Sequence, residues 1–243
     1  MAQRISRRAT LGLGALLLVG GTAAQAASSA SALAFDKSNY TTITITVDSQ
    51  TMSVRWYKEL CYVANPQAMA ATQSSGTIAN PTCGYQSMNV FVPESAANDQ
   101  KTAIYFAVNN AGWMSSYVAA SVADGASFDS STSNVGAALK AGYVYVDVGT
   151  RGRGITAADG SYAGKSPAAI VDAKAAVRYL RLNDAAMPGS AERIVVNGTS
   201  GGGALSAILG ASGNSADYLP WLADIGAAGV DARGHSTLRD DVF

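Results

Sequence analysis

Hydrophobic and polar residues alternate along three segments in the first half of the chain. Segments 43–47, 52–56 and 88–92 place isoleucine, valine, methionine or tryptophan at every second position. A period of two with β-branched residues predicts strands that bury one face. The polar stretch 48–51 lies between the first two segments. These two segments are therefore predicted to form an antiparallel hairpin.

Three later segments are short, nearly continuous hydrophobic runs. They are residues 103–108, 143–148 and 194–196. Runs of this kind are typical of strands that are buried on both faces, as in a parallel sheet covered by helices.

Helical spacing appears between and after these runs. In Ser166–Asn183 the apolar residues recur on one helical face, and Ser166 and Pro167 are suited to the cap and the first turn. Residues 201–211 are rich in glycine, alanine and leucine and also fit a helix. The whole pattern predicts an α/β fold, with a mostly parallel sheet flanked by helices and an antiparallel N-terminal hairpin.

Composition narrows the class of protein. The chain has 243 residues, of which 48% are hydrophobic and only 14% are charged. This length is enough for one substantial core. No basic stripe is present, which argues against nucleic-acid partners and binding to anionic lipid. No His/Cys/Asp cluster has metal-ligand spacing, so no metal and no cofactor are expected.

The first residues have the layout of an export signal. Arg7 and Arg8 precede an apolar run from Leu11 to Gly20, and Ala24-Gln25-Ala26 offers a small-residue cleavage site. We predict a twin-arginine-type signal peptide over residues 1–26, a linker over 27–34 and one folded domain over 35–243. The product would be periplasmic or extracellular, without stable membrane association after cleavage. The alternatives are an ordinary Sec signal and a short membrane anchor.

The two cysteines are interpreted in the light of export. Cys61 and Cys83 flank the Pro- and Ser-containing loop 64–84. In an oxidising compartment they are expected to pair as a disulfide, and the even count leaves no odd thiol. The alternative is two separate buried thiols.

A candidate nucleophile follows the last hydrophobic run. Gly198-Thr199-Ser200-Gly201-Gly202 is a G-x-S-x-G motif between a predicted strand and a predicted helix. A sharp strand-to-helix turn would expose the Ser200 hydroxyl, and the Gly201 N–H would donate to an oxyanion. The motif alone is weak, and its context strengthens it. The alternative is a glycine-rich helix start with an unimportant serine.

A second oxyanion donor is expected from the loop after strand 103–108. In Asn109–Trp113 the N–H of Ala111 or Gly112 could face the site, because Gly112 permits close backbone approach. The alternative is an ordinary polar turn.

From Phe35 to its end the sequence resembles bacterial tannases, which are tannin acyl hydrolases of the α/β-hydrolase class alongside feruloyl esterases. The matching runs are residues 149–154, 164–180 and 197–213. The resemblance implies an α/β-hydrolase fold, Ser200 as nucleophile of a serine carboxylesterase, and a small phenolic (galloyl-like) ester as substrate. It places the other oxyanion donor in the loop 109–113. Arg151 and Arg153 match family positions, but the sequence assigns neither of them a role, and the simplest expectation for both is a surface ion pair.

In tannases the triad acid and histidine, and the residues that hold the acyl group, come well after the serine. This chain ends at Phe243, about 43 residues past Ser200, and its single histidine, His235, follows Asp231 in a loop-like stretch. We therefore expect a fold truncated after the nucleophile elbow and a chain that is inactive as it stands. The alternatives are a feruloyl or other carboxylesterase on the same scaffold, and a non-catalytic hydrolase remnant.

Overall fold

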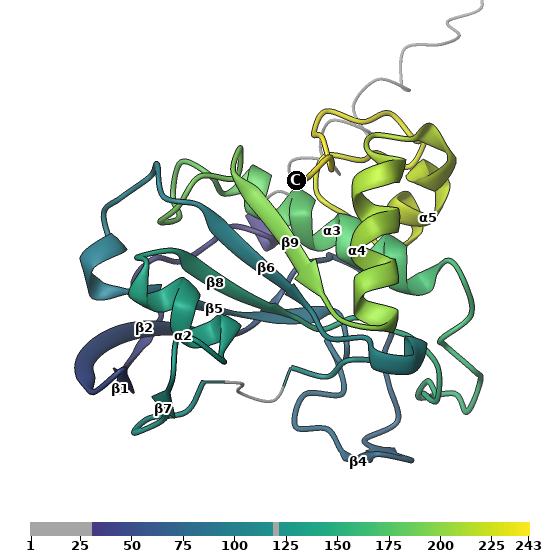
Figure 1. Ribbon diagram of the computed structural model, residues 1–243. Helices are drawn as coiled ribbons and strands as arrows, with labels where there is room; N and C mark the ends of the chain where they lie inside the picture. Colours follow the sequence, from purple (N-terminus) through teal and green to yellow (C-terminus); the bar gives the residue numbers. More distant parts are fainter. Residues whose placement is uncertain (1–30, 119–121) are drawn as a thin grey trace, which may run out of the picture.

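The computed structural model describes residues 31–118 and 122–243; the expected signal peptide lies outside them. A single seven-stranded sheet runs through the molecule in the order β7-β1-β2-β5-β8-β6-β9 (Figure 1). Its strands are β1 (Thr41–Val47), β2 (Gln50–Cys61), β5 (Ser87–Pro93), β6 (Ile104–Val108), β7 (Ser127–Phe128), β8 (Val144–Val148) and β9 (Ile194–Gly198). A separate two-stranded ribbon joins β3 (Thr72–Gln73) to β4 (Gly76–Thr77).

The sheet is mixed. β8, β6 and β9 are parallel, whereas β1, β2, β5 and β8 pair antiparallel in succession. The three continuous hydrophobic runs form the parallel part, and the alternating segments form the antiparallel part. The α/β fold class predicted from the sequence is confirmed.

Helices cover both faces of the sheet. The larger core lies under α3 (Ala168–Leu182), α4 (Gly201–Ser212) and α5 (Leu219–Asp224), and a smaller core lies under α2 (Asn134–Lys140) on the other face. Three short 3₁₀ helices complete the fold: η1 (Glu94–Ala96), η2 (Ala111–Trp113) and η3 (Ala216–Tyr218). Leu33, inside the expected linker, is 3% exposed and belongs to the larger core.

Two local expectations differ from the structure. The first hairpin turns over only two residues, Asp48 and Ser49, both with positive φ, so that Val47 pairs with Gln50. Two such residues match the right-handed twist of the flanking strands better than a longer polar turn does. Helix α3 begins at Ala168 after Pro167, and no side chain caps it. The cap predicted at Ser166 is therefore wrong.

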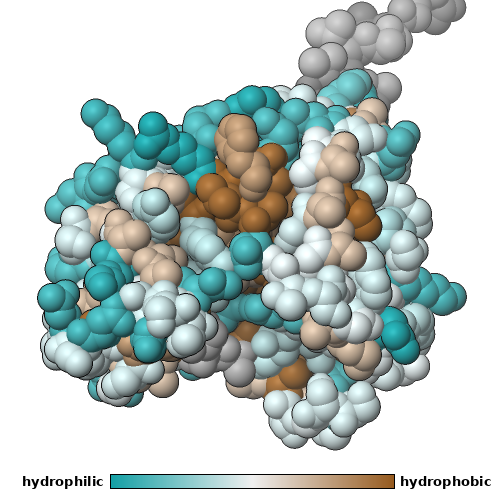
Figure 2. Space-filling model, viewed as in Figure 1, coloured by the Kyte–Doolittle hydropathy of each residue, from teal (hydrophilic) through white to brown (hydrophobic). Residues whose placement is uncertain are grey.

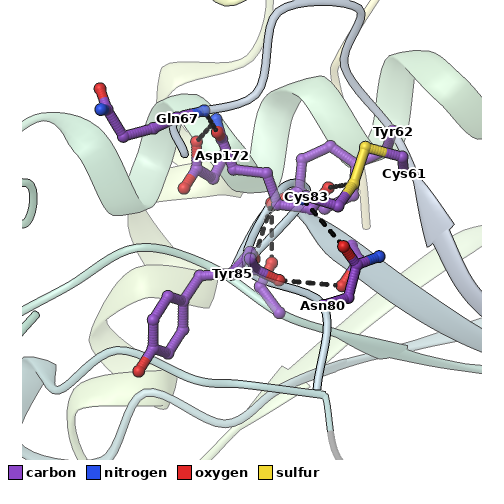
Figure 3. The surroundings of a disulfide bond; sticks show 11 residues. Cys61, Tyr62, Gln67, Asn80, Cys83, Tyr85 and Asp172 are labelled. Carbon is purple, nitrogen blue, oxygen red and sulfur yellow. Dashed lines mark hydrogen bonds between the residues drawn. A yellow bond between two sulfur atoms is a disulfide. The ribbon is translucent and has the colours of Figure 1, made fainter. Parts of the chain in front are cut away.

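The disulfide between Cys61 and Cys83 is confirmed, with the two Cα atoms 5.9 Å apart. It joins the end of β2 to the loop that leads into β5 (Figure 3). The side chain of Asn80 accepts a hydrogen bond from the backbone N–H of Cys83 at 3.2 Å. The hydroxyl of Tyr62, next to Cys61, donates to the carbonyl of Gly149 at 2.7 Å. The bridge thus anchors a loop that contacts the carboxyl end of β8.

Replacing both cysteines with alanine is expected to lower the free energy of unfolding by about 3 kcal/mol, because the unfolded chain regains the entropy of a loop of this length. Thermal unfolding with and without reductant measures this, and reduced wild-type protein is the control for the double variant. The thermal midpoints of the double variant and of the reduced wild-type protein should both lie roughly 6–12 °C below that of the oxidised protein. Unchanged midpoints contradict it.

Strand β9 is the last strand of the sheet, and its outer edge is largely open. Among the residues described, Phe243 alone pairs with this edge. Val196 N–H donates to the Phe243 carbonyl at 2.9 Å, and Phe243 N–H donates to the Ile194 carbonyl at 3.1 Å. Val195 is 44% exposed and Phe243 76%. Hydrophobic residues gather over this edge in Figure 2. Within the described residues, no helix is long and apolar enough to cross a membrane.

A buried charge cluster holds the C-terminal segment against α3. The carboxylate of Asp240 accepts from Lys174 Nζ at 2.8 Å and from Arg178 Nε at 2.7 Å. All three side chains are at most 2% exposed. Arg178 also donates to the Ser236 hydroxyl at 2.9 Å. One carboxylate therefore neutralises part of the charge of two buried cations.

Candidate functional site

The site is built around an abrupt turn at the carboxyl end of the parallel strands. β9 ends at Gly198, and α4 begins at Gly201. Between them Ser200 has φ 57° and ψ −124°, a conformation that few residues other than glycine adopt. The side chain is exposed, and within the described part of the chain no group hydrogen-bonds to its hydroxyl. This is the strained strand-turn-helix geometry that the sequence predicts for Ser200.

Glycines make the turn possible because the backbone passes too close for side chains. A Cβ on Gly198 would lie within 3.0 Å of the Gly202 backbone. A Cβ on Gly201 would lie within 3.0 Å of the Asn110 carbonyl and of Trp113 N. The start of α4 is therefore packed directly onto the loop that follows β6.

That loop is positioned by the sheet. β6 and β9 are parallel, with Val108 opposite Gly198, so the residues after each strand meet at the same edge. η2 follows β6 and contacts α4. Gly112, inside η2, has φ 63° and ψ 19°. The sequence-predicted residues Ser200, Gly201 and Gly112 are thus brought together.

The backbone N–H groups differ in availability. Trp113 N–H donates to the Asn110 carbonyl at 2.9 Å. Within the described ranges, the N–H groups of Gly201, Ala111 and Gly112 have no protein acceptor. The nitrogen of Gly112 is 3.1 Å from the position that a Cβ on Gly201 would take, and Ala111 N is not among the three nearest atoms. Of the two candidate nitrogens in this loop, that of Gly112 therefore lies closer to the Cβ position of Gly201.

Arg151 does not form the surface ion pair expected from the sequence. Its guanidinium donates to the carboxylate of Asp172 from Nη2 at 2.8 Å and from Nε at 3.0 Å. The two side chains are 12% and 0% exposed, so the pair is buried. Burial opposes the charge on Arg151, but the Asp172 carboxylate outweighs burial and raises the pKa of the guanidinium. The expectation failed because the partner lies 21 residues away, on α3.

Arg153 also departs from the expected ion pair. Its Nη1 donates to the carbonyl of Gly112 at 3.2 Å, and no carboxylate lies within ion-pair distance among the residues described. The side chain is thereby aimed at the loop beside Ser200.

The single histidine lies away from Ser200. His235 Nδ1 is 3.1 Å from the carboxylate of Asp231, and the His235 side chain is 73% exposed. A hydrogen bond from the backbone N–H of His235 lowers the pKa of Asp231. In Figure 1 this segment, in yellow, lies at the far end of α4 from the turn that holds Ser200. The structure therefore brings neither residue to the candidate nucleophile.

A cavity of about 450 Å³ opens beside the loop 109–113, between α3 and α4. Trp113, Ile170, Leu205 and Ile208 contribute apolar surface to it, and Arg153 is the one charged residue in its lining. Its size and mostly apolar lining are typical of a small-molecule site. Across residues 31–118 and 122–243, no group of three or more His, Cys, Asp or Glu side chains could hold a metal ion.

Some residues around the site were not predicted from the sequence. Trp113, 40% exposed, packs its backbone against Gly201. Asn110 is fully buried and donates from Nδ2 to Thr150 Oγ1 at 2.6 Å. A tryptophan in a polar loop was the available signal for the first, whereas the second contact joins loops 40 residues apart and leaves no sequence pattern.

Comparison with known proteins finds one matching family and several similar structures. The model of the BD-FAE family matches residues 88–224. The tannase of Fusobacterium nucleatum is 39% identical, with a TM-score of 0.68 over 87% of this chain and 41% of that one. Native tannin acyl hydrolase from Lactobacillus plantarum is 32% identical, with a TM-score of 0.66 over 87% and 43%. A tannin acyl hydrolase in complex with ethyl gallate gives 32% identity and a TM-score of 0.68 over 87% and 43%.

The chain thus spans less than half the length of the tannase structures that it matches. No curated protein sequence showed a significant match.

Proposed function

Because the chain belongs to the BD-FAE family and shares its α/β-hydrolase fold with tannases, we propose that it is the nucleophile-bearing part of an exported serine carboxylesterase. One observation carries the proposal. The strained, exposed Ser200 stands beside two N–H groups, of Gly201 and Gly112, that have no acceptor in the described structure.

In the proposed reaction Ser200 Oγ attacks the carbonyl carbon of an ester while a general base takes the hydroxyl proton. The carbonyl π electrons move to the oxygen, which becomes an oxyanion. The N–H groups of Gly201 and Gly112, with Ala111 as the alternative to Gly112, donate to that oxyanion. The C–O bond to the alcohol then breaks, the alcohol leaves with a proton, and water hydrolyses the acyl-enzyme.

The base is the part of this mechanism that the described residues do not place. His235 is paired with Asp231 at the other end of α4. We propose that the histidine and the acid come from a region corresponding to the tannase sequence that the match does not cover. The 243-residue chain alone would then hydrolyse esters only slowly.

The proposed substrates are small phenolic esters of the galloyl type. A matched tannin acyl hydrolase was crystallised with ethyl gallate. The cavity beside Trp113 and Arg153 has room for an aromatic ring and offers a cation to its oxygen substituents. The BD-FAE match supports feruloyl esters as the second candidate. Relative rates on methyl gallate and methyl ferulate discriminate between the two.

Export is proposed from the N-terminal sequence and is consistent with the disulfide. The mature protein is expected to begin near Ala27. Intact-mass measurement on periplasmic protein tests this, and a retained Arg7-Arg8 pair contradicts it.

The direct test of the nucleophile is covalent labelling with a fluorophosphonate ester, followed by peptide mapping. We expect the label on the peptide that contains Ser200, and none in the Ser200→Ala variant. A form carrying any natural downstream sequence should label faster than the 243-residue chain. Label on another residue, or none in either form, would favour a non-catalytic hydrolase remnant.

A further inference from the structure

Residues 149–154 lie between α3 and the loop that carries Gly112. They follow β8 directly, and Gly149, at their start, accepts the hydrogen bond from Tyr62 near the disulfide. A Cβ on Gly152 would lie within 3.0 Å of the backbone of Met114 and Ser115. The segment therefore packs directly against the chain that leaves η2.

On the α3 side the segment is held through Asp172. Besides the two guanidinium contacts, the backbone N–H of Arg151 donates to Asp172 Oδ2 at 2.8 Å. Gln86 Nε2 donates to Asp172 Oδ1 at 2.9 Å. Both Asp172 and Gln86 are 0% exposed, and Asp172 lies beside the disulfide-closed loop in Figure 3. A fully buried carboxylate thus collects four donors, three of them from Arg151.

On the other side the segment forms a short ladder with residues 113–116. Arg153 N–H donates to the Trp113 carbonyl at 2.8 Å, and Ser115 N–H donates to the Arg153 carbonyl at 3.1 Å. Ser116 and Thr150 exchange backbone hydrogen bonds at 3.0 and 2.9 Å. These four bonds lie on both sides of Arg151, so a shift of Arg151 would move the backbone of the loop 110–116.

The side chains of the segment reach the same loop. Thr150 Oγ1 accepts from Asn110 Nδ2, and Arg153 binds the carbonyl of Gly112. Contacts therefore fall on residues 110, 112, 113, 115 and 116, that is, on Gly112 and on the chain to either side of it. An oxyanion donor acts only when it is held in place before the reaction, because misplacement by about 1 Å costs on the order of 100-fold in rate.

We propose that the Arg151–Asp172 pair positions the Gly112 N–H for the oxyanion, with Arg151 and Asp172 as positioning residues that do not touch substrate. The proposal rests on the proposed function for its catalytic meaning. The structural part of the proposal, that Asp172 holds the loop 110–116 in place, does not depend on the proposed function. A pair that merely stabilised the fold would affect the whole protein equally.

The test compares Asp172→Asn with Asp240→Asn in the 243-residue chain. Both variants remove the charge of a buried carboxylate that is paired with a cation. Only Asp172 is linked, through Arg151, to the loop 110–116. Backbone amide NMR gives the chemical shift of Gly112 and the hydrogen-exchange rates of Trp113, Ser115 and Arg153. In Asp172→Asn we expect a shifted Gly112 amide and exchange at least about 10-fold faster at these three positions, through local opening.

In Asp240→Asn the same amides should change only as much as the rest of the core. Equal effects of the two variants on these amides overturn the proposal. Should Asp172→Asn fail to fold, Arg151→Lys answers the same question, because it keeps the charge and loses the forked contact. A smaller acceleration confined to the same amides is expected there, and an unchanged loop again overturns the proposal.

In any form of the protein that turns over esters, Asp172→Asn should lower kcat by roughly 10- to 100-fold and leave KM unchanged, since the oxyanion exists only after the attack. A fall no larger than that of Asp240→Asn contradicts the proposal. The two hypotheses can fail independently. If the fluorophosphonate does not label Ser200, the proposed function is wrong, but the amide data still test the coupling between Asp172 and the loop 110–116. If Ser200 is labelled and Asp172→Asn does not change hydrogen exchange locally, only the positioning role is wrong.

Discussion

Replacing Ser200 with alanine is expected to remove nearly all ester hydrolysis from any active form of this protein. A serine hydroxyl that loses its proton to a base supplies the covalent step, and losing the serine of such a triad costs on the order of 10⁶ in kcat. The oxyanion donors and binding would leave roughly 10³–10⁴ over water. The measurement is hydrolysis of methyl gallate, methyl ferulate and a nitrophenyl ester, with folding checked by circular dichroism.

The same assay tests the location of the base. The 243-residue chain should be slow on all three esters, and His235→Ala should change nothing, because His235 is exposed and paired with Asp231. Fast turnover by the short chain that disappears on Ser200→Ala would show that a base lies within these residues. An active longer form that tolerates Ser200→Ala would remove the nucleophile assignment itself.

Replacing Asp240 with alanine is expected to lower the free energy of unfolding by about 3–5 kcal/mol. The substitution leaves Lys174 and Arg178 buried without their carboxylate, and both side chains are at most 2% exposed. It also frees the C-terminal segment from α3. For a domain of this size the thermal midpoint should fall by roughly 6–20 °C.

The neighbouring residue provides the matched control. Asp241 pairs with Arg181 and Arg239 at 3.7 and 3.5 Å, and its side chain is 37% exposed. Arg181 is only 6% exposed, but it keeps a closer carboxylate, that of Glu192 at 2.8 Å. The Arg239 pair is exposed, and such pairs contribute at most about 1 kcal/mol, so Asp241→Ala should leave the midpoint almost unchanged. Equal midpoints for the two variants would mean that water reaches the Asp240 cluster.

Much of the fold could be predicted because its main elements carry local patterns. The period of two marks β1, β2 and β5, and the continuous hydrophobic runs mark β6, β8 and β9. Elements of two residues, such as β7, are too short to show any period. Helix α2 spans only seven residues, and its one signal is the cap, where Ser133 Oγ accepts from Gly136 N–H at 3.1 Å.

In the candidate site, too, residues within local sequence patterns could be predicted, whereas contacts between distant segments could not. Ser200 and Gly201 belong to a local motif, and the loop 109–113 follows a strand that could be recognised, so these residues were predicted from the sequence. Arg151 and Asp172 were not predicted as a pair, because their contact depends on how α3 packs beside β8. The choice of Gly112 over Ala111 likewise depends on a close approach between two loops, which no spacing in the sequence encodes.

The positive φ of Ser200 means that the residue proposed as nucleophile also lowers the stability of the fold. Such a backbone conformation costs a non-glycine residue about 1–3 kcal/mol, and glycine would adopt it without strain. A selection for heat resistance would therefore favour glycine at position 200, which would also remove the hydroxyl of the proposed nucleophile. Searches for variants of higher thermal stability should keep serine at position 200, since the most stable sequence on this backbone is expected to lack the proposed nucleophile.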